Sequence, residues 1–414
     1  MRALPLSLLT LLGAASATLD AEYPQVPLVA QDRTPDVSPE APYSSTMRDE
    51  LLALHRSLVE IESETLYETH VGDWLADYLE ARGYTVQRQH MPVRSPGAGE
   101  ARFNIIAWPG KTGRPQPRVI VSSHIDAVPP HIPYAISDEH PTAETVIRGR
   151  GSVDAKGSVA AQIVAVQSLL DGGAVDEADV ALLFVVGEEG PGDGMRFFSE
   201  SAERRALGGF EAVIFGEPTQ NKLACGHKGG LFCSVEARGV AGHSGYPWLG
   251  KSANELLVRA MYALATTDLG SSDRFGNTTV NIGRFYGGVA INVIPEHAKA
   301  DLAVRVAIGP EDEGGLIVAE RIRGILAGID PEAFTLEYTH AYGVVESDCT
   351  APGFETTVES YGTDMPNLKG DYTRYLYGPG SILVAHGPTE SLTVGDLETA
   401  VDGFKRLILH ALRK

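Results

Sequence analysis

Residues 180–190 read VALLFVVGEEG, an uninterrupted apolar run that ends in a glycine and two glutamates. Two other stretches have the same form: residues 119–126 read VIVSSHID, and residues 212–217 read AVIFGE. Strands that are apolar throughout are typical of sheets covered by helices on both faces. Together with a fourth expected strand at residues 382–385 (ILVA), these stretches predict an α/β fold built on a mostly parallel, helix-covered sheet.

Helical patterns separate the expected strands. Residues 158–170 (SVAAQIVAVQSLL) are apolar nearly all round, which predicts a deeply packed helix. Residues 253–266 and 315–326 also have helical character, and they lie in a region where strand patterns become alternating. This region has the order β-α-β-β-α-β, which is typical of a small open-faced sandwich.

The change in character divides the chain into domains. We expect a larger α/β domain over residues 45–230 and 346–414, interrupted by an inserted α+β domain over residues 231–345. Residues 1–17 (MRALPLSLLTLLGAASA) combine a positive start, an apolar core and a small-residue cleavage site, which predicts a secretory signal peptide. Residues 18–44 are proline-rich and are interpreted as a tail or pro-segment. The predicted location is therefore outside the cell.

Composition and charge exclude several classes of protein. The chain has 414 residues, of which 43% are hydrophobic and 21% charged, as in ordinary globular proteins. The net charge of −20 and the lack of a basic cluster argue against nucleic-acid binding. Outside the signal segment, no run approaches the roughly 18 apolar residues that a membrane span needs. We expect neither a nucleic acid nor a membrane as a partner.

The cysteines and the glycosylation sequon allow further predictions about disulfides and glycans in a secreted chain. Three cysteines are present, Cys225, Cys233 and Cys349, so at least one is free or pairs outside the chain. A Cys225–Cys233 disulfide and packed, inert thiols are both compatible with the sequence. Asn277 stands in the only N-x-[ST] sequon and is predicted to carry a glycan on the surface.

Histidines and carboxylates gather where the expected strands end. In open α/β sheets, ligands bind at this carboxyl edge. Buried carboxylates that approach each other are costly unless a cation neutralises them. A set of nitrogen and oxygen donors suits Zn²⁺, and Mn²⁺ or Co²⁺ less well, and one bridging carboxylate would let two ions share the set. The residues at these positions are His124, Asp126, Asp154, Glu188, Glu189, Glu217 and His386, of which two histidines and three carboxylates would suffice for such a site.

Six motifs resemble metallopeptidase family 20, which includes carboxypeptidase G, aminoacylase, acetylornithine deacetylase and succinyl-diaminopimelate desuccinylase. They occur in the family's order and spacing over residues 46–414, and they read SSHIDAVP, GRGSVDAKGS, VVGEEGPGDG, FGEPT, GVAGHSGYP and VAHGPTE. The chain departs from the family pattern at Ser123, where many relatives have glycine, and over residues 129–146. The resemblance implies a hydrolase with two Zn²⁺ ions per chain, with Co²⁺ or Mn²⁺ as substitutes.

The resemblance also implies how the ligands divide between the ions. His124 and Glu217 would hold the first ion, Glu189 and His386 the second, and Asp154 would bridge them. The resemblance further implies a homodimer formed through residues 231–345.

Catalytic and substrate-binding roles follow from the same resemblance. Glu188 would be the general base, and Asp126 would hold the imidazole of His124 in the correct tautomer. His243 would be an oxyanion donor, which in many relatives comes from a partner subunit. Asn292 and Arg305 would contact a substrate carboxylate, which a guanidinium can bind with two hydrogen bonds.

These expectations define one function and two alternatives. The predicted function is that of a secreted zinc-dependent carboxypeptidase, which hydrolyses an amide bond next to a free carboxylate of a peptide. The first alternative is an N-acyl-amino-acid deacylase, which would use the same catalytic residues on an N-acyl amino acid. The second is a non-catalytic carboxylate-binding protein, which would be expected to lack a ligand or the base.

Overall fold

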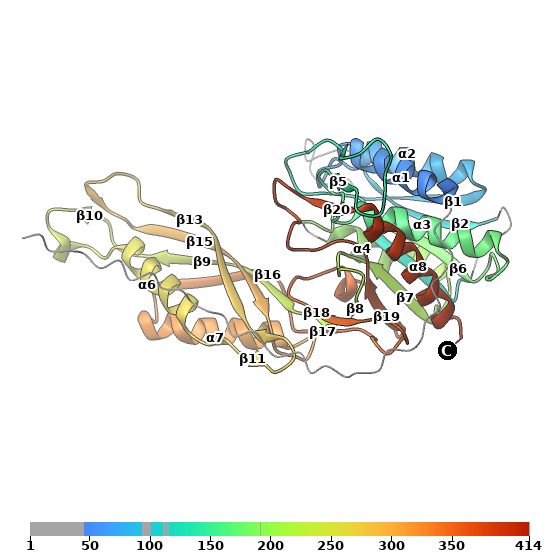
Figure 1. Cartoon of the computed structure of the whole chain (residues 1–414). Coiled ribbons are helices and arrows are strands. Elements are labelled where there is room, and N and C mark those ends of the chain that lie inside the picture. Colours follow the sequence, from blue (N-terminus) through green and yellow to red (C-terminus); the bar gives the residue numbers. More distant parts are fainter. Residues whose placement is uncertain (1–44, 93–100, 111–112, 114–115, 191, 414) are drawn as a thin grey trace, which may run out of the picture. The chain divides into compact units, whose positions relative to one another are not determined.

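The protein is described here by a computed structural model that covers residues 45–92, 101–110, 113, 116–190 and 192–413 (Figure 1). The predicted signal peptide (residues 1–17) and proline-rich tail (residues 18–44) lie outside these residues. Among the helices of the described part, none has the length and apolar character needed to cross a bilayer.

The main sheet has nine strands, and its centre is parallel. Strands β6, β3, β7 and β19 run parallel to one another in this order, whereas the strands on either side pair antiparallel. The expected parallel arrangement is thus confirmed for the centre, and the sheet as a whole is mixed. Its strands are β1 (Tyr84–His90), β2 (Phe103–Pro109), β3 (Val119–His124), β6 (Val180–Val185), β7 (Ala212–Gly216), β8 (Leu223–His227), β17 (Val345–Glu346), β18 (Thr356–Glu359) and β19 (Thr373–Tyr377).

Both faces of this sheet are buried, which explains why its central strands are apolar throughout. In β6, Leu182 and Phe184 belong to one core, whereas Leu183 and Val185 belong to the core on the opposite face. The first core is shared with α1 (Ser45–Glu60), α2 (Thr69–Ala81), α3 (Lys156–Asp171) and α8 (Val394–Ala411). The second is covered by α4 (Asp193–Glu200) and the chain around α5 (Ala202–Ala206). Helix α3 confirms the packed helix predicted at residues 158–170.

The segment after β8 forms a second sheet with its own core. The predicted order is confirmed by β9 (Gly229–Arg238), α6 (Ala253–Thr266), β13 (Thr279–Gly287), β15 (His297–Val306), α7 (Gly314–Ile329) and β16 (Phe334–Tyr342). The strand order is β13-β15-β9-β16. Leu231 and Val235 of β9 pack with Leu257 of α6 and Ile322 of α7, so the helices cover one face and leave the other open. The domain boundaries at residues 231 and 345 stay a prediction.

Short elements complete the described fold. They are β4 (Ala135–Ile136), β5 (Val146–Arg148) and β20 (Ser391–Thr393) in a small sheet, the pairs β10 (Gly242–His243) with β14 (Val293–Ile294) and β11 (Ser271–Ser272) with β12 (Gly276–Asn277), and the 3₁₀ turns η1 (Pro247–Leu249) and η2 (Met365–Asn367).

The strand predicted at residues 382–385 is wrong. This segment forms turns, with the N–H of Ala385 donating to the carbonyl of Ile382 at 3.2 Å, and Leu383 is 85% exposed. On the side of β7 away from β3, the pairing strand is β19, whose aromatic residues Tyr375 and Tyr377 are buried. The apolar run is only four residues long and lies between Gly380 and Gly387, where turn formation outweighs strand propensity.

The cysteines pair differently from the one pairing considered above. Cys225 of β8 forms a disulfide with Cys349, across 124 residues of sequence, and Cys233 is free and buried. A Cys225–Cys233 disulfide is therefore wrong, because Cys233 packs into the core of the inserted domain. The disulfide joins the chain just before it enters the second sheet to the chain just after it returns. Asn277 is exposed on β12, and its glycan stays a prediction.

We expect the double variant Cys225→Ala/Cys349→Ala to unfold more easily than the native chain. A disulfide that closes so long a loop restricts the unfolded chain, and its loss typically lowers the free energy of unfolding by about 2–5 kcal/mol. Urea denaturation without reductant measures the change, and Cys233→Ala is the matched control, because it removes a buried cysteine that forms no disulfide. If the double variant were as stable as Cys233→Ala, the disulfide would not stabilise the fold.

Candidate metal centre

The five residues predicted as metal ligands lie together at the carboxyl edge of the main sheet. His124 ends β3, Glu217 directly follows β7, and Glu189 lies in the loop after β6. Asp154 precedes α3, and His386 lies in the turn before β20, with φ +62°. The five residues form two groups of potential ligands, His124–Asp154–Glu217 and Asp154–Glu189–His386. In each group, the ligand atoms lie within 4.8 Å of one another.

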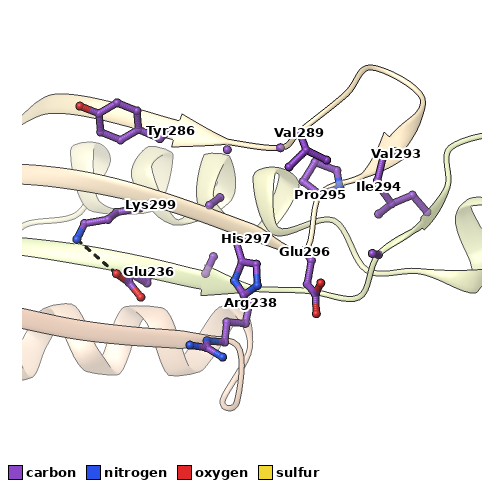
Figure 2. Close-up of a pocket in the computed structure, with 15 residues that line it drawn as sticks. Glu236, Arg238, Tyr286, Val289, Val293, Ile294, Pro295, Glu296, His297 and Lys299 are labelled. Carbon is purple, nitrogen blue, oxygen red and sulfur yellow. Dashed lines mark hydrogen bonds and ion pairs between the residues drawn. The ribbon is translucent and has the colours of Figure 1, made fainter.

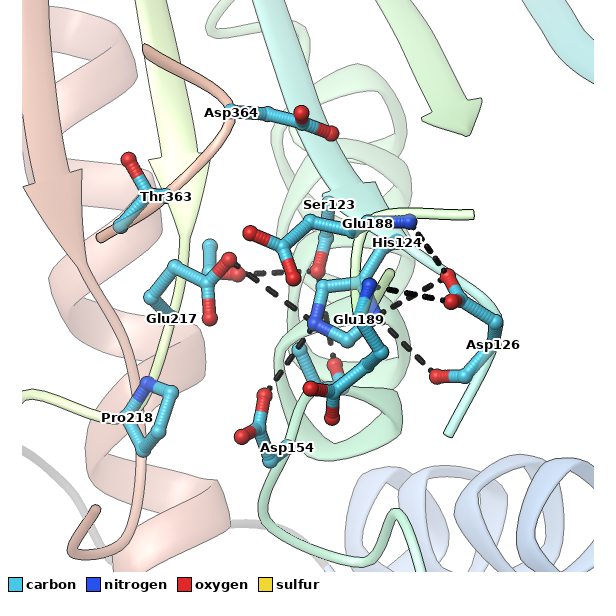
Figure 3. Close-up of polar contacts among 12 residues, drawn as sticks. Ser123, His124, Asp126, Asp154, Glu188, Glu189, Glu217, Pro218, Thr363 and Asp364 are labelled. Carbon is cyan, nitrogen blue, oxygen red and sulfur yellow. Dashed lines mark hydrogen bonds and ion pairs between the residues drawn. The ribbon is translucent and has the colours of Figure 1, made fainter. Parts of the chain in front are cut away.

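Asp154 is common to both groups and contacts a histidine with each oxygen. Its Oδ1 is 3.1 Å from His124 Nε2, and its Oδ2 is 3.3 Å from His386 Nε2. Glu217 Oε1 lies 3.8 Å from the same nitrogen of His124, and Glu189 Oε2 lies 2.9 Å from His386 Nε2. Figure 3 shows the side chains of His124, Asp154, Glu189 and Glu217 converging on one region.

The electrostatics of the cluster indicate a need for positive charge. Burial raises the pKa of Glu189 and of Glu217 to about 7. Burial opposes the charged form of His124, but the charge of Glu217 and hydrogen bonds to Asp126 and Asp154 raise its pKa. Hydrogen bonds to Asp154 and Glu189 raise the pKa of His386 to about 10. Protons thus neutralise the cluster, and cations can replace them because metal ligands must lose their protons to bind.

The donor set fits two divalent metal ions. It contains imidazole nitrogens and carboxylate oxygens without a thiolate, which suits Zn²⁺ and neighbouring divalent ions. Because both groups use Asp154, two ions held by them would share this carboxylate as a bridge, as in other two-metal sites.

Glu188 lies beside the ligand Glu189 but belongs to neither ligand group. It lines a pocket of about 560 Å³ together with Asp154, Glu189, Glu217 and His386. Burial, together with the charge of Glu217, raises the pKa of Glu188 well above its usual range. The carboxyl group therefore lies at the cluster and, without bound metal ions, holds its proton more strongly than an exposed glutamate does.

Asp126 positions the loop that carries both glutamates. Its carboxylate accepts the backbone N–H groups of Glu188 and Glu189, each at 3.1 Å, and the hydroxyl of Thr65 at 2.8 Å. The nearer partner of His124 Nδ1 is the backbone carbonyl of Asp126, at 3.1 Å, and a carboxylate oxygen lies at 3.5 Å. Both contacts hold the imidazole from the side opposite to Asp154.

A buried ion pair, which the sequence reasoning missed, holds two of the ligands from behind. Arg150 and Glu390 are 3% and 2% exposed, and their charged groups meet at 2.7 Å. The guanidinium of Arg150 also donates to the carbonyls of Gly387 and His386, at 3.1 and 3.4 Å. The other oxygen of Glu390 accepts the N–H of Asp154 at 3.2 Å. Arg150 lies in the motif GRGSVDAKGS and Glu390 in the motif VAHGPTE. The sequence therefore already placed both residues within motifs that carry metal ligands.

The predicted substrate contacts divide into two places. Arg305 lines the pocket, whereas His243 and Asn292 do not. These two lie together in the inserted domain, where His243 pairs with Val293 and the N–H of Ser244 donates to the carbonyl of Asn292 at 3.1 Å. A second pocket of about 410 Å³ lies in the inserted domain, and none of the predicted site residues lines it (Figure 2). The first pocket also contains Arg196, His340, Tyr342 and Asp364, which the sequence reasoning missed.

Comparison with known proteins gives a consistent family. A family model described as the peptidase dimerisation domain matches residues 225–323. A "Peptidase M20 domain-containing protein" from Sordaria macrospora is 54% identical over 386 residues, which cover 88% of this chain and 85% of that protein. A "Probable carboxypeptidase" from Aspergillus flavus is 46% identical over 383 residues, which cover 88% of each chain.

A solved structure shares the fold. The M20 family metallo-carboxypeptidase from Sulfolobus solfataricus superposes with a TM-score of 0.66 at 15% identity, covering 88% of this chain and 100% of that one. At this identity, the likeness shows the architecture alone, and the family is shown by the two similar sequences. This chain is a hydrolase that belongs to the M20 family of peptidases.

Proposed function

We propose that the protein is a zinc-dependent carboxypeptidase that hydrolyses the amide bond next to the terminal carboxylate of a peptide. The observation that carries this proposal is the pocket that Glu188 and Arg305 line together with four members of the two ligand groups, which are Asp154, Glu189, Glu217 and His386. The Arg305 guanidinium would repel a protonated amino terminus of a substrate. It would attract a terminal carboxylate, and it lies in the same pocket as the ligands.

Three residues of the chain, Glu188, Asp126 and Arg305, would have distinct parts in this reaction. Two bound zinc ions would polarise the scissile carbonyl and make water acidic. Glu188 takes a proton from the attacking water and returns it to the leaving amine. Asp126 holds Glu188 in place through its backbone N–H, and Arg305 fixes the substrate carboxylate and thereby the position of the scissile bond.

We also propose that the active enzyme is a homodimer formed through residues 231–345. His243 and Asn292 lie outside the pocket of their own chain, in the region matched by the dimerisation model. A second copy could bring its His243 to the carbonyl oxygen of the substrate and its Asn292 to the carboxylate. The pairing of β10 with β14 keeps His243 and Asn292 next to each other, so that both could reach the same substrate in the partner's pocket.

Secretion is supported by two independent features. Residues 1–17 have the form of a signal peptide, and the Cys225–Cys349 disulfide is of the kind that persists in oxidising compartments. Glycosylation at Asn277 would follow from the same route.

Metal removal and a substrate comparison test the proposal. We expect about two equivalents of zinc in the purified chain, loss of hydrolysis after dialysis against a chelator, and recovery when zinc is returned. N-blocked dipeptides and N-acetyl amino acids should be compared on the same preparation, with metal content measured by mass spectrometry. Exclusive cleavage of N-acetyl amino acids would replace the carboxypeptidase by the deacylase, and zinc binding without hydrolysis of either would leave only a binding protein.

A further inference from the structure

Two residues near the start of β2, Arg102 and Asn104, contact the chain around the predicted general base. Because β2 runs antiparallel to β6, its start lies beside the end of β6 and the chain that follows. The amide oxygen of Asn104 accepts the N–H of Val186 at 3.1 Å, and its amide nitrogen donates to the carbonyl of Gly194 at 2.8 Å. Asn104, which is fully buried, thus binds the chain on both sides of residues 187–190 (the base loop).

Arg102 forms two buried salt bridges next to the base loop. The side chains of Arg102 and Glu68 are both buried, with residue exposures of 5% and 1%. Nη1 of Arg102 lies 3.2 Å from Oε1 of Glu68, and its Nη2 donates to the carboxylate of Asp193. Glu68 directly precedes α2, and Asp193 is the first residue of α4. One guanidinium therefore joins the start of α2 to the start of the helix that follows the base loop.

The backbone of Gly187, directly before Glu188, lies against these salt bridges. Its φ is +74°, and a Cβ built on it would lie 2.8 Å from Nη1 of Arg102 and would also overlap the carboxylate of Asp193. Glycine fits here because it has no Cβ and adopts a positive φ readily. The carbonyl of Gly187 also accepts the N–H of Gly192 at 2.7 Å. The backbone conformation at the start of the base loop is therefore fixed by contact with Arg102 and Asp193.

We propose that Arg102, acting through Asp193, is a positioning residue for the general base, because its salt bridges hold the base loop so that the carboxyl group of Glu188 lies at the metal centre. The inference rests on the proposed carboxypeptidase function. It extends that function to residues away from the substrate, since neither Arg102 nor Asp193 lines the pocket. Displacing a catalytic group by about 1 Å can lower the rate about 10²-fold. A support outside the pocket can therefore control kcat.

Asp193→Asn is the variant that weakens this support with the least damage to the fold. It keeps the size of the side chain and removes one of the two charges that Arg102 binds, while Arg102 keeps its salt bridge with Glu68. Arg102→Met would instead leave the buried carboxylate of Glu68 without a partner, which destabilises the fold. Arg102→Lys is the second variant, because lysine retains the charge but lacks the planar fork that can bind two carboxylates.

The test is a double-mutant cycle with Glu188→Gln, measured on an N-blocked dipeptide with the zinc-loaded full chain. In the native background, Asp193→Asn should lower kcat by about tenfold or more and leave KM near the native value. In the Glu188→Gln background, whose slow hydrolysis is followed at high enzyme concentration, it should lower kcat by less than about twofold, because the group that it positions is absent. Arg102→Lys should show the same pattern with a smaller effect. The matched control is Asp171→Asn, at the exposed end of α3 and outside the pocket, which should leave kcat within about twofold of native.

Three results would overturn the inference. A merely structural role would lower kcat by the same factor in both backgrounds. Loss of zinc from Asp193→Asn would show that the salt bridges support the ligand Glu189 rather than the base. Native kcat in both Asp193→Asn and Arg102→Lys would show that they support neither. In all three cases the native chain still cleaves the dipeptide and the carboxypeptidase stands, whereas a zinc-loaded native chain that cleaves no peptide would refute the proposed function itself.

Discussion

Replacing Glu188 with glutamine should lower kcat by at least about 10²-fold, because a positioned general base contributes about 10²–10⁴-fold to such reactions. Glutamine keeps the size of the side chain and the backbone N–H that Asp126 accepts, so the loop should retain its conformation. Since Glu188 belongs to neither ligand group, the variant should bind as much zinc as the native chain. Steady-state kinetics on an N-blocked dipeptide and metal analysis of the same sample measure both expectations.

The matched control for this variant is Glu200→Gln, at the exposed end of α4. It removes the same charge from the same domain and should leave kcat within about twofold of native, as surface substitutions usually have small effects. Hydrolysis at the native rate by zinc-loaded Glu188→Gln would show that another group transfers the proton. Loss of zinc from Glu188→Gln would instead make Glu188 a ligand.

Replacing Arg150 with methionine should lower the free energy of unfolding by about 3–5 kcal/mol, because it leaves the buried carboxylate of Glu390 without its partner. The variant also removes the donors that hold the carbonyls of His386 and Gly387. Since Glu390 holds the N–H of Asp154 on its other side, the two ligands would lose their common support. We therefore expect weaker zinc binding along with lower stability, measured by chelator competition and by urea denaturation of the zinc-free chain.

Arg148→Met provides the matched control, two residues away on β5 with an exposed side chain. It should change the free energy of unfolding by less than about 0.5 kcal/mol. Equal effects of the two variants would show that the ion pair with Glu390 contributes nothing of its own. Lower stability with native zinc affinity would limit the pair to a structural role.

Periodicity and strand-end chemistry account for much of what the sequence could predict. The central strands were recognisable because β6 packs against a core on each face, so that every side chain has to be apolar. The helix predicted at residues 253–266 agrees with α6, because one stripe of that helix packs on the second sheet. Four of the five expected ligands follow a strand or precede a helix at one edge of the sheet, and the resemblance to the family distinguished them from the neighbouring carboxylates.

The remaining features depend on contacts between distant segments. His386 was placed after a strand that does not exist, and it reaches the cluster from a turn. The pairing of Cys225 with Cys349 depends on where the chain returns to the main domain, which cysteine spacing does not reveal. Arg196 and His340 meet across two domains and stand in no pattern, so only the structure shows that they share the pocket with Arg305.

The way the inserted domain joins the main sheet bears on how such proteins diversify. Its two connections leave from adjacent antiparallel strands, since His227 of β8 pairs with Val345 of β17. The whole segment is therefore equivalent to a greatly enlarged hairpin loop. Evolution can exchange or remodel that loop while the register of the main sheet, and with it the five ligands, is unchanged. Because Arg305 and Phe232 belong to the loop, a new substrate range can arise while the five ligands and Glu188 stay in place.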